Sequence, residues 1–413
     1  MKEQLSIALE PLVEVSGGYK SGLRTFLPKL AMAITLFVML LVAVECICYL
    51  LLQQQMSTSG EERNFPRSLY KNKPWVDELW REWEKLGSES QYKAYVVWRG
   101  SPHQGALVNV DSEGLRFTAH SDCSAGNYTI WMFGNSALFG KGSRDWETIP
   151  SLLAARYEAS GRKVCVKNYG ERGWVGTQEL IQLMLALKSN PQRPDLVIFY
   201  DGIADAFLPY ETAAGDVHGN YETMRSWFTE GRELKKPGFA YLEKSNTYRE
   251  LLRITTRWDR SGAAHAHAAT PGTPQDLARQ TVESYVKNTD IGEALAQKFG
   301  FRCVFFLQPT ALIAAKPLTT EEQRVGDNEE NANPGIRAVF RATYQIFQSL
   351  QQPDYFYLGD IFSDHPERLF IDTSHVTPEA NEIIAAAMYH DIDEAGIGKS
   401  NSSKSGIDSK GAN

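Results

Sequence analysis

Short apolar runs alternate with helix-length patterns over residues 128–390, and this alternation restricts the possible folds more than any other feature of the sequence. The apolar runs are rich in β-branched and aromatic residues, as β-strands are; they are 128–133, 163–167, 196–200, 301–307 and 355–358. The helical patterns are 149–159, 177–188, 278–299, 334–350 and 378–390. Strands that alternate with helices form parallel βαβ units. The sequence therefore predicts an α/β fold, a three-layer α/β/α sandwich of flavodoxin-like type around a five-stranded, mostly parallel sheet.

The apolar run at residues 30–52 predicts one transmembrane helix ahead of this domain, because it contains a single charged residue, Glu45. At about 1.5 Å per residue, roughly 20 apolar residues cross the hydrocarbon core of a bilayer. A cleaved signal peptide is the alternative; the long preceding segment and the lack of a small-residue cleavage site favour an anchor. A carboxylate is costly in lipid. The position of Glu45 in the outer third of the run predicts that it snorkels to the interface, and pairing with a partner helix is the other interpretation.

Basic residues predict how this helix is oriented. Lys20, Arg24 and Lys29 precede the apolar run, whereas the first basic residue after it is Arg63. Positive residues concentrate on the cytoplasmic side of membrane helices. We therefore expect a cytoplasmic N-terminus and a periplasmic or equivalent location for everything after about residue 53.

The composition along the chain predicts five segments, which are 1–29 in the cytoplasm, 30–52 in the membrane, a polar stalk at 53–90, the α/β domain at 91–393 and a disordered tail at 394–413. The stalk contains a Trp-rich amphipathic pattern whose acidic polar face favours packing on the domain over lying on the membrane. The domain contains a long insertion at about 206–275. Long connections of this kind are usually functional lids or linkers, so we expect a helical lid followed by a flexible link.

The charge balance excludes one class of partner. The chain of 413 residues has 43 Lys and Arg against 50 Asp and Glu, a net charge of −7. Nucleic-acid binding depends on neutralising phosphates with clustered basic residues. We therefore expect no nucleic-acid partner.

Cysteine and histidine usage argues against a metal or redox site. The cysteines outside the membrane run are Cys123, Cys165 and Cys303, which allow at most one internal disulfide. Cys165 and Cys303 lie in predicted strands, so we expect them to be small core residues. His265 and His267 lack further ligands at metal-binding spacing, and we expect neither a metal nor another cofactor.

Polar side chains follow the predicted strands, where ligands bind in parallel α/β sheets. Ser136 follows the first strand in the sequence FGNSALFG. A serine at a strand-to-helix turn has an exposed hydroxyl near backbone N–H groups, so it is a candidate nucleophile; the alternative is a serine that only caps the next helix. Asp372 precedes His375 by three residues in DTSHVTPEAN. An aspartate that orients a histidine is the base half of a Ser-His-Asp system.

The chain resembles the SGNH/GDSL hydrolase superfamily in four short motifs, which occur in the order that the family has. They are Gly134-Asn135-Ser136, the glycine at 173 in NYGERGW, Gly202-Ile203-Ala204-Asp205, and Asp372 with His375. The resemblance implies a serine nucleophile at Ser136, a general base at His375 and an orienting carboxylate at Asp372. It also implies an oxyanion hole formed by the backbone N–H groups of Ser136 and Gly173.

Two positions depart from the family pattern. Asn135 replaces an aspartate, which leaves the nucleophile in place. Ala204 replaces an asparagine whose amide donates to the oxyanion; removal of one such donor typically costs about 10²–10³ in rate. Another side chain such as Asn168 compensates, or catalysis is slow, or the protein is a degenerate member of the family.

The resemblance implies a membrane-anchored serine esterase that removes O-acetyl groups from a polysaccharide. The segments YVVWRGSP, VNVDSEGLRFT and RPDLVIFYDG are also similar to membrane-anchored SGNH proteins of bacterial exopolysaccharide gene clusters. That similarity implies the bacterial inner membrane and other polysaccharide-biosynthesis proteins as partners. Two alternatives stay open, an O-acyltransferase that uses the same serine and a non-catalytic binding or assembly subunit. Asn168, Tyr210 and Trp227 are candidate substrate-binding residues. Tyr210 and Trp227 of the insertion are candidates for stacking on sugars, with core packing as the alternative.

Overall fold

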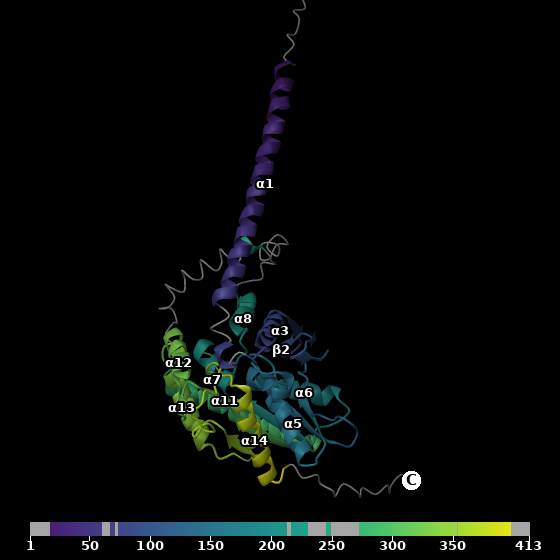
Figure 1. Cartoon of the computed structure of the whole chain (residues 1–413), viewed down its shortest axis with the longest axis vertical. Coiled ribbons are helices and arrows are strands. Elements are labelled where there is room, and N and C mark those ends of the chain that lie inside the picture. The colour runs from purple at the N-terminus through teal and green to yellow at the C-terminus, as the bar shows by residue number, and fades with distance from the viewer. Residues whose placement is uncertain are drawn as a thin grey trace, which may run out of the picture. The chain divides into compact units, whose positions relative to one another are not determined.

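The computed structural model describes residues 17–59, 67–70, 73–212, 216–229, 245–248, 272–352 and 354–397. The chain divides into two compact units. One unit comprises Met1–Gly60 and Arg232–Ala266, and the other comprises Glu61–Gly231 and His267–Asn413. The second unit contains the sheet and the candidate site, and Figure 1 labels its elements.

A five-stranded parallel sheet forms the centre of the second unit. Its strands are β5 (Tyr128–Gly134), β6 (Val164–Asn168), β7 (Leu196–Asp201), β8 (Arg302–Leu307) and β9 (Tyr355–Tyr357). They lie in the order β6-β5-β7-β8-β9, and every neighbouring pair is parallel. The predicted fold class is thus confirmed. The chain reverses its direction across the sheet between β6 and β7, so the carboxyl ends of β5 and β7 flank the crevice where ligands bind in such sheets.

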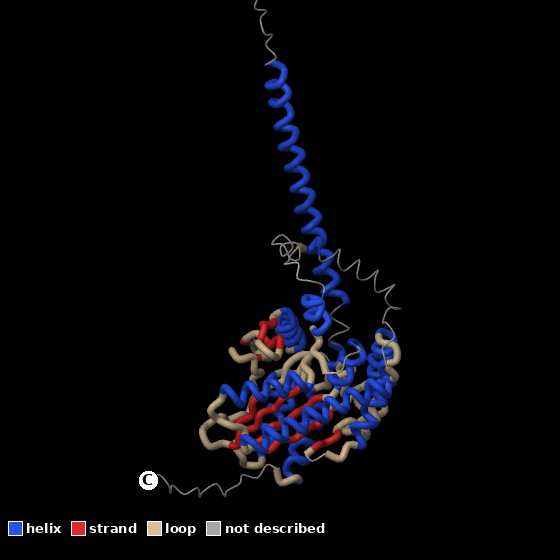
Figure 2. Tube along the Cα trace, turned by 180° about the vertical axis from the view of Figure 1, so that it is seen from behind, coloured by secondary structure: helices blue, strands red, loops and turns tan. Residues whose placement is uncertain are grey.

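Helices cover both faces of the sheet, as Figure 2 shows. α5 (Ile149–Ala159) and α14 (Pro378–Glu394) pack on one face. The other face is covered by α6 (Gly176–Ser189), α7 (Ile203–Thr212), α11 (Pro274–Phe299) and α13 (Ile336–Ser349). The remaining helical elements of this unit are η1 (Arg67–Tyr70), α3 (Val76–Ser88), α4 (Ser136–Phe139), η2 (Asp145–Glu147), α8 (Tyr221–Thr229) and α12 (Thr320–Ala332).

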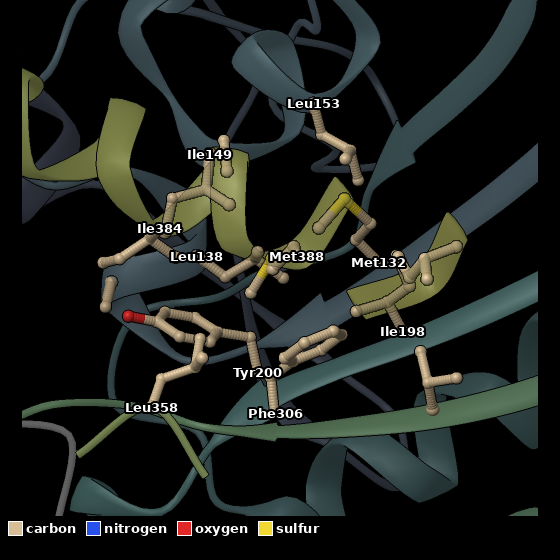
Figure 3. Packing of buried hydrophobic residues seen from close by; sticks show 14 of the residues in the cluster. Met132, Leu138, Ile149, Leu153, Ile198, Tyr200, Phe306, Leu358, Ile384 and Met388 are labelled. Carbon is tan, nitrogen blue, oxygen red and sulfur yellow. The ribbon is translucent and has the colours of Figure 1, made fainter. Parts of the chain in front are cut away.

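The alternation of side chains along the strands divides the core into two layers. Met132 points toward α5 and α14, whereas its neighbours in β5 pack in the cluster on the other face. In the first layer, Ile198 and Tyr200 of β7 lie close to Ile384 and Met388 of α14 (Figure 3). All of these side chains are almost completely buried. Because both faces are buried, the strands are continuously apolar, and this is the pattern that made them recognisable in the sequence.

The segment expected to be a stalk contributes to the folded unit. Its helix α3 places Leu79 and Trp83 in a cluster with Phe139 and Ile371. Phe139 is in the short helix that begins at Ser136, and Ile371 directly precedes Asp372. The predicted packing of this helix on the domain is confirmed. Two short antiparallel pairs follow α3, β1 (Ser90–Lys93) with β2 (Val97–Gly100) and β3 (His103–Gln104) with β4 (Asn109–Val110).

One helix in the described part of the chain is long and apolar enough to cross a membrane, Pro28–Leu50 within α1 (Gly17–Ser59). Glu45 in this helix accepts hydrogen bonds from residues of the same unit that lie 200 positions further along the chain. Its donors are the hydroxyls of Ser245 (2.8 Å) and Thr247 (2.7 Å) and the backbone N–H groups of Asn246 and Thr247. Glu45 therefore has hydrogen-bond partners within its own unit, and its place at the membrane interface stays a prediction.

Several predicted segments lie outside the described residues. They are the first part of the N-terminal segment (1–16), most of the insertion including His265 and His267, and the tail from 398 onward. The part of the predicted lid that is described as α7 packs against the sheet. Among the described residues, no group of three or more His, Cys, Asp or Glu side chains is placed to hold a metal ion.

Cys165 and Cys123 form a disulfide, which is the one internal disulfide that the sequence allowed. Cys165 is buried in β6 as expected, but β6 is an edge strand, and the loop that leads into β5 runs beside it. A strand pattern does not reveal which loop reaches an edge strand. Cys303 is a buried free thiol, as predicted.

Three carboxylates lie together behind the end of β7. Glu179 and Asp201 are almost completely buried. Burial and the neighbouring Asp201 and Asp205 carboxylates raise the pKa of Glu179 well above its usual value. Burial also raises the pKa of Asp201, and it raises the pKa of Asp205 to about 6. A proton on Glu179 that is donated to Asp201 satisfies oxygens that otherwise have no hydrogen-bond partner in the described structure.

We expect Glu179→Gln to change how stability depends on pH. Glu179 keeps its proton in the folded state and loses it in the unfolded state above about pH 4.3, so the folded protein loses stability as the pH rises from there toward the raised pKa. Glutamine removes this dependence. The difference in unfolding free energy between variant and wild type should therefore grow in favour of the variant from pH 5 to pH 8, by up to about 1.4 kcal/mol per pH unit.

Urea unfolding of the detergent-solubilised chain at these two pH values measures the effect. The exposed Glu84→Gln serves as a control and should show no such difference. A constant offset between Glu179→Gln and wild type at both pH values would contradict a protonated Glu179.

Candidate active site

Ser136 lies in the tight turn that joins β5 to the one-turn helix α4. Asn135 is the N-cap of this helix, and its side-chain oxygen accepts a hydrogen bond from the Ala137 N–H at 2.9 Å. Gly134 is required at the end of β5, because a Cβ there would lie 2.4 Å from the carbonyl oxygen of Tyr200. Since Asn135 performs the capping, the hydroxyl of Ser136 is available for another partner. The structure thus favours the interpretation of Ser136 as a nucleophile over its interpretation as a helix cap.

Asp372 and His375 lie in a closed turn between β9 and α14. The turn is bounded by an antiparallel bridge between Phe370 and Val376, and the Ile371 N–H donates to the His375 carbonyl at 2.8 Å. Asp372 Oδ1 accepts the N–H groups of Ser374 (2.9 Å) and His375 (2.8 Å). These backbone bonds hold the carboxylate on the same side of the turn as the imidazole.

A continuous series of hydrogen bonds joins the three predicted catalytic residues. Ser136 Oγ lies 2.7 Å from His375 Nε2, and His375 Nδ1 lies 2.7 Å from both carboxylate oxygens of Asp372. An ionised carboxylate only accepts hydrogen bonds, so Nδ1 carries the proton and Nε2 accepts from the serine hydroxyl. This is the tautomer that a histidine needs in order to remove the serine proton.

The electrostatics of the pair favour a neutral imidazole beside an ionised carboxylate. Burial raises the pKa of Asp372, but His375, Lys141 and the backbone donors outweigh it and hold that pKa well below its usual range. Burial lowers the pKa of His375, the Asp372 charge raises it and the Lys141 charge lowers it again; the sum lies below the usual histidine value. A neutral imidazole is the form that acts as a general base.

A cavity of about 860 Å³ opens over Ser136. Gly173 and Ala204 line it together with Ser136 and His375, so the predicted oxyanion positions share one space with the nucleophile. Within the described residues, the N–H groups of Ser136 and Gly173 donate to no other protein group. Ala204 provides no side-chain donor, as the sequence predicts, and the two N–H groups are the donors that this geometry offers an oxyanion.

A buried ion pair holds the loop that carries Gly173. Arg99, from β2, donates to the Tyr169 carbonyl at 2.9 Å and lies 3.6 Å from the Glu171 carboxylate. Both charged side chains are almost completely inaccessible to solvent. Glu171 also accepts the Gly100 N–H at 2.8 Å. Arg99 and Glu171 thus hold the loop between the end of β6 and Gly173. Gly173 itself has a φ of +71°, in the left-handed region that glycine tolerates.

A second buried arginine holds the turn that carries Ser136. The Arg116 guanidinium donates to the carbonyl groups of Phe139 (3.0 Å), Gly140 (2.8 Å) and Ser143 (2.6 Å) and to the Asp145 carboxylate (3.1 Å). A cation at the C-terminus of a short helix satisfies carbonyl groups that have no helical partner. The orientation of α4 therefore depends on a side chain outside the nucleophile motif.

A pair of amides links the two halves of the site. Asn135 donates from its amide nitrogen to Gln308 Oε1 at 2.6 Å, and Gln308 in turn donates to the Ser374 carbonyl at 3.5 Å. The departure at Asn135 thus has a structural partner at the end of β8. This link ties the serine turn to the turn that carries Asp372 and His375.

The structure does not bring the predicted substrate-binding residues Asn168 and Tyr210 to the cavity. Asn168 is completely buried, bonds to the Leu138 carbonyl and the Gly170 N–H, and lies beside a separate cavity of about 580 Å³. Tyr210 is buried in the core, and its hydroxyl donates to the Pro334 carbonyl at 2.8 Å. The structure thus places Asn168 away from this cavity and favours the second interpretation of Tyr210, which is core packing. The side chain of Trp227 lies outside the described residues.

Residues of α12 line the cavity, although the sequence did not predict them as site residues. Asn328, Glu329 and Asn331 provide a polar wall, whereas Phe207 and Leu208 of α7 provide apolar surface. The polar character of α12 gave no amphipathic signal, since little more than Glu322 and Gly326 of this helix is buried. A capping box at Thr319 and Glu322 was the available signal for a helix start.

Comparison with known proteins finds weak structural similarities. A member of the lipolytic protein G-D-S-L family from Veillonella parvula is 10% identical, with a TM-score of 0.33, and the match covers 64% of this chain and 96% of that one. The psychrotrophic esterase EstA from Pseudoalteromonas sp. is 14% identical, with a TM-score of 0.30 and coverages of 65% and 98%. AlinE4, an SGNH-hydrolase family esterase, is 13% identical, with a TM-score of 0.28 and coverages of 66% and 98%.

The chain matches no protein-family model. It also matches no curated protein sequence.

We expect Arg99→Met to destabilise the protein and to disturb the Gly173 loop, because it removes the buried one of the two cations that lie 3.6 Å from the Glu171 carboxylate. Arg172 remains, so the loss should stay below that of a fully unpaired buried charge. Breaking a buried pair from one side typically costs about 3–5 kcal/mol. Chemical unfolding measures this loss, and the double variant with Glu171→Gln should recover part of it. Arg302→Met, which breaks an ion pair whose arginine is half exposed, is the control and should cost less than about 1 kcal/mol. Equal stability of Arg99→Met and wild type would contradict this role for the pair.

Proposed function

We propose that the chain is a membrane-anchored serine esterase of SGNH type whose domain lies outside the cytoplasm. The observation that carries the proposal is the hydrogen-bonded series from Ser136 through His375 to Asp372, which opens into a cavity shared with Gly173. Ser136 attacks the carbonyl carbon of an ester while His375 takes the hydroxyl proton. The resulting oxyanion binds the N–H groups of Ser136 and Gly173, and His375 then returns the proton to the leaving alcohol.

Two features support the location outside the cytoplasm. The helix Pro28–Leu50 is long and apolar enough to anchor the chain, with basic residues before it. The disulfide between Cys123 and Cys165 is of the kind that persists in oxidising compartments and is rare in the cytosol.

The cavity supports an acylated carbohydrate, such as an O-acetylated polysaccharide, as the substrate. Amides and a carboxylate are suited to bind sugar hydroxyls, and α12 supplies Asn328, Glu329 and Asn331. Phe207 and Leu208 provide apolar contact for an acyl group or for the C–H face of a sugar. The resemblance to exopolysaccharide-cluster proteins points in the same direction and makes polysaccharide-biosynthesis proteins the expected membrane partners.

Labelling with a fluorophosphonate probe tests whether the serine is activated. We expect the full-length protein in detergent to be labelled, and Ser136→Ala and His375→Ala to remain unlabelled. Labelling that does not depend on Ser136 would contradict the proposal, and a folded wild-type protein that is never labelled would favour a non-catalytic binding subunit. Acetate release from an acetylated oligosaccharide, with and without an acceptor sugar, then separates hydrolysis from acyl transfer.

We expect Ala204→Asn to raise the rate of ester cleavage, because it restores a side-chain donor at the oxyanion position. The gain should reach up to about 10²-fold in kcat with little change in KM, since the donor acts on charge that develops in the transition state. Ala204→Val, which adds bulk without a donor, is the matched control. A loss of activity in both variants, with the fold intact, would mean that the oxyanion lies elsewhere.

A further inference from the structure

Lys141 contacts both ends of the candidate triad. Its backbone N–H donates to the Ser136 carbonyl at 3.1 Å, at the point where Gly140 ends α4 in the left-handed conformation. Its ammonium lies 3.3 Å from Asp372 Oδ2 and is partly buried. One residue therefore ties the backbone of the nucleophile to the carboxylate that orients the base, across 231 positions of sequence.

The charges around His375 make this ammonium influential. The groups that act on the imidazole are the Asp372 carboxylate and the Lys141 ammonium. The described residues that line the cavity include no lysine or arginine, and their other acidic group is Glu329 of α12. Glu147, Glu379 and Arg368 act, together with Asp372, on the Tyr70 hydroxyl.

We propose that Lys141 is a positioning residue of the triad, which keeps the Asp372 carboxylate ionised and in place and opposes protonation of His375. This proposal rests on the proposed function only for its effect on catalysis. The cation attracts Asp372 and repels an imidazolium ion on its neighbour, so it has opposite effects on the two members of the pair. Its consequence is that His375 stays neutral, and able to act as a base, in more acidic solution than it otherwise would.

A pH titration distinguishes this role from a purely structural one. Lys141→Met removes the charge and keeps most of the side-chain length, whereas Lys141→Arg keeps the charge. We expect Lys141→Met to raise the pKa of His375 by about one pH unit, and Lys141→Arg to leave it within about 0.3 of wild type. Loss of a structural contact alone would lower activity at every pH without moving this midpoint.

Two measurements on the full-length protein in detergent report the shift. Ring-labelled histidine followed by NMR gives the titration of His375 directly, with the signal assigned through His375→Ala. The rate of fluorophosphonate labelling as a function of pH gives the same midpoint through Ser136. We expect the acidic limb of the labelling rate to move upward by about one unit in Lys141→Met. Lys141→Gln provides a second neutral variant in case Lys141→Met does not fold.

The outcomes separate the two proposals. An unchanged His375 midpoint in a folded neutral variant overturns the role of Lys141, whether or not Ser136 is labelled. A shifted NMR midpoint in a protein whose Ser136 is never labelled supports the role of Lys141 and contradicts the esterase function. A shift of equal size in Lys141→Arg also overturns the proposal, because the charge is then not responsible.

Discussion

The candidate site depends on the constraint that parallel strands end at the same edge of a sheet. Because β5 pairs with β7, Ser136, which lies two residues after the end of β5, is near the residues that follow β7, including Ala204. The pairing of β5 with β6 on its other side brings the Gly173 loop to the same place. β8 then supplies Gln308, which reaches the turn of Asp372 and His375. Positions far apart in sequence thus meet because of the strand order, and the site lies where that order reverses.

Strand order alone does not hold the loops, because each loop carries polar backbone groups that lie in the interior. Each of the three loops of the site contacts a buried cation. The cation donates hydrogen bonds to carbonyl groups of the loop and is paired with a buried carboxylate. The pairs are Arg116 with Asp145 at the nucleophile turn, Arg99 with Glu171 at the Gly173 loop, and Lys316 with Glu322 at the Asp372 turn. Glu322 also accepts the N–H groups of Leu369 and Phe370. Buried ion pairs contribute little net stability, so their contribution here is the position of the loops.

The strands and the long helices could be predicted from the sequence, because residues buried on both faces produce continuous apolar runs and α5 was predicted with its observed bounds. Ser136, Asp372 and His375 could be found because each follows a strand or precedes a helix in a short motif. The arginines that hold the loops could not, since their partners are backbone carbonyls 70 or 23 positions away. Asn168 was misplaced, and the choice between stacking and packing for Tyr210 stayed open, for a related reason: periodicity shows that a residue lies at a strand end or in a helix, but not which side chain turns inward. The pairing of Cys165 likewise depends on the path of a loop.

Ala204 and Lys141 act on the two charges that develop in the proposed reaction. The oxyanion forms beside Ala204, which offers no side-chain donor, so its stabilisation falls to backbone N–H groups. The imidazolium forms on His375 beside the Lys141 ammonium, which disfavours it. At a pH where His375 is already neutral, both residues therefore raise the activation barrier of the proposed ester cleavage. The same ammonium lowers the pH at which His375 becomes protonated. A site of this kind therefore has a lower maximal rate, but its histidine stays neutral and can act as a base in more acidic solution. That balance suits the location that we propose for the domain, outside the cytoplasm, where the pH follows the surroundings.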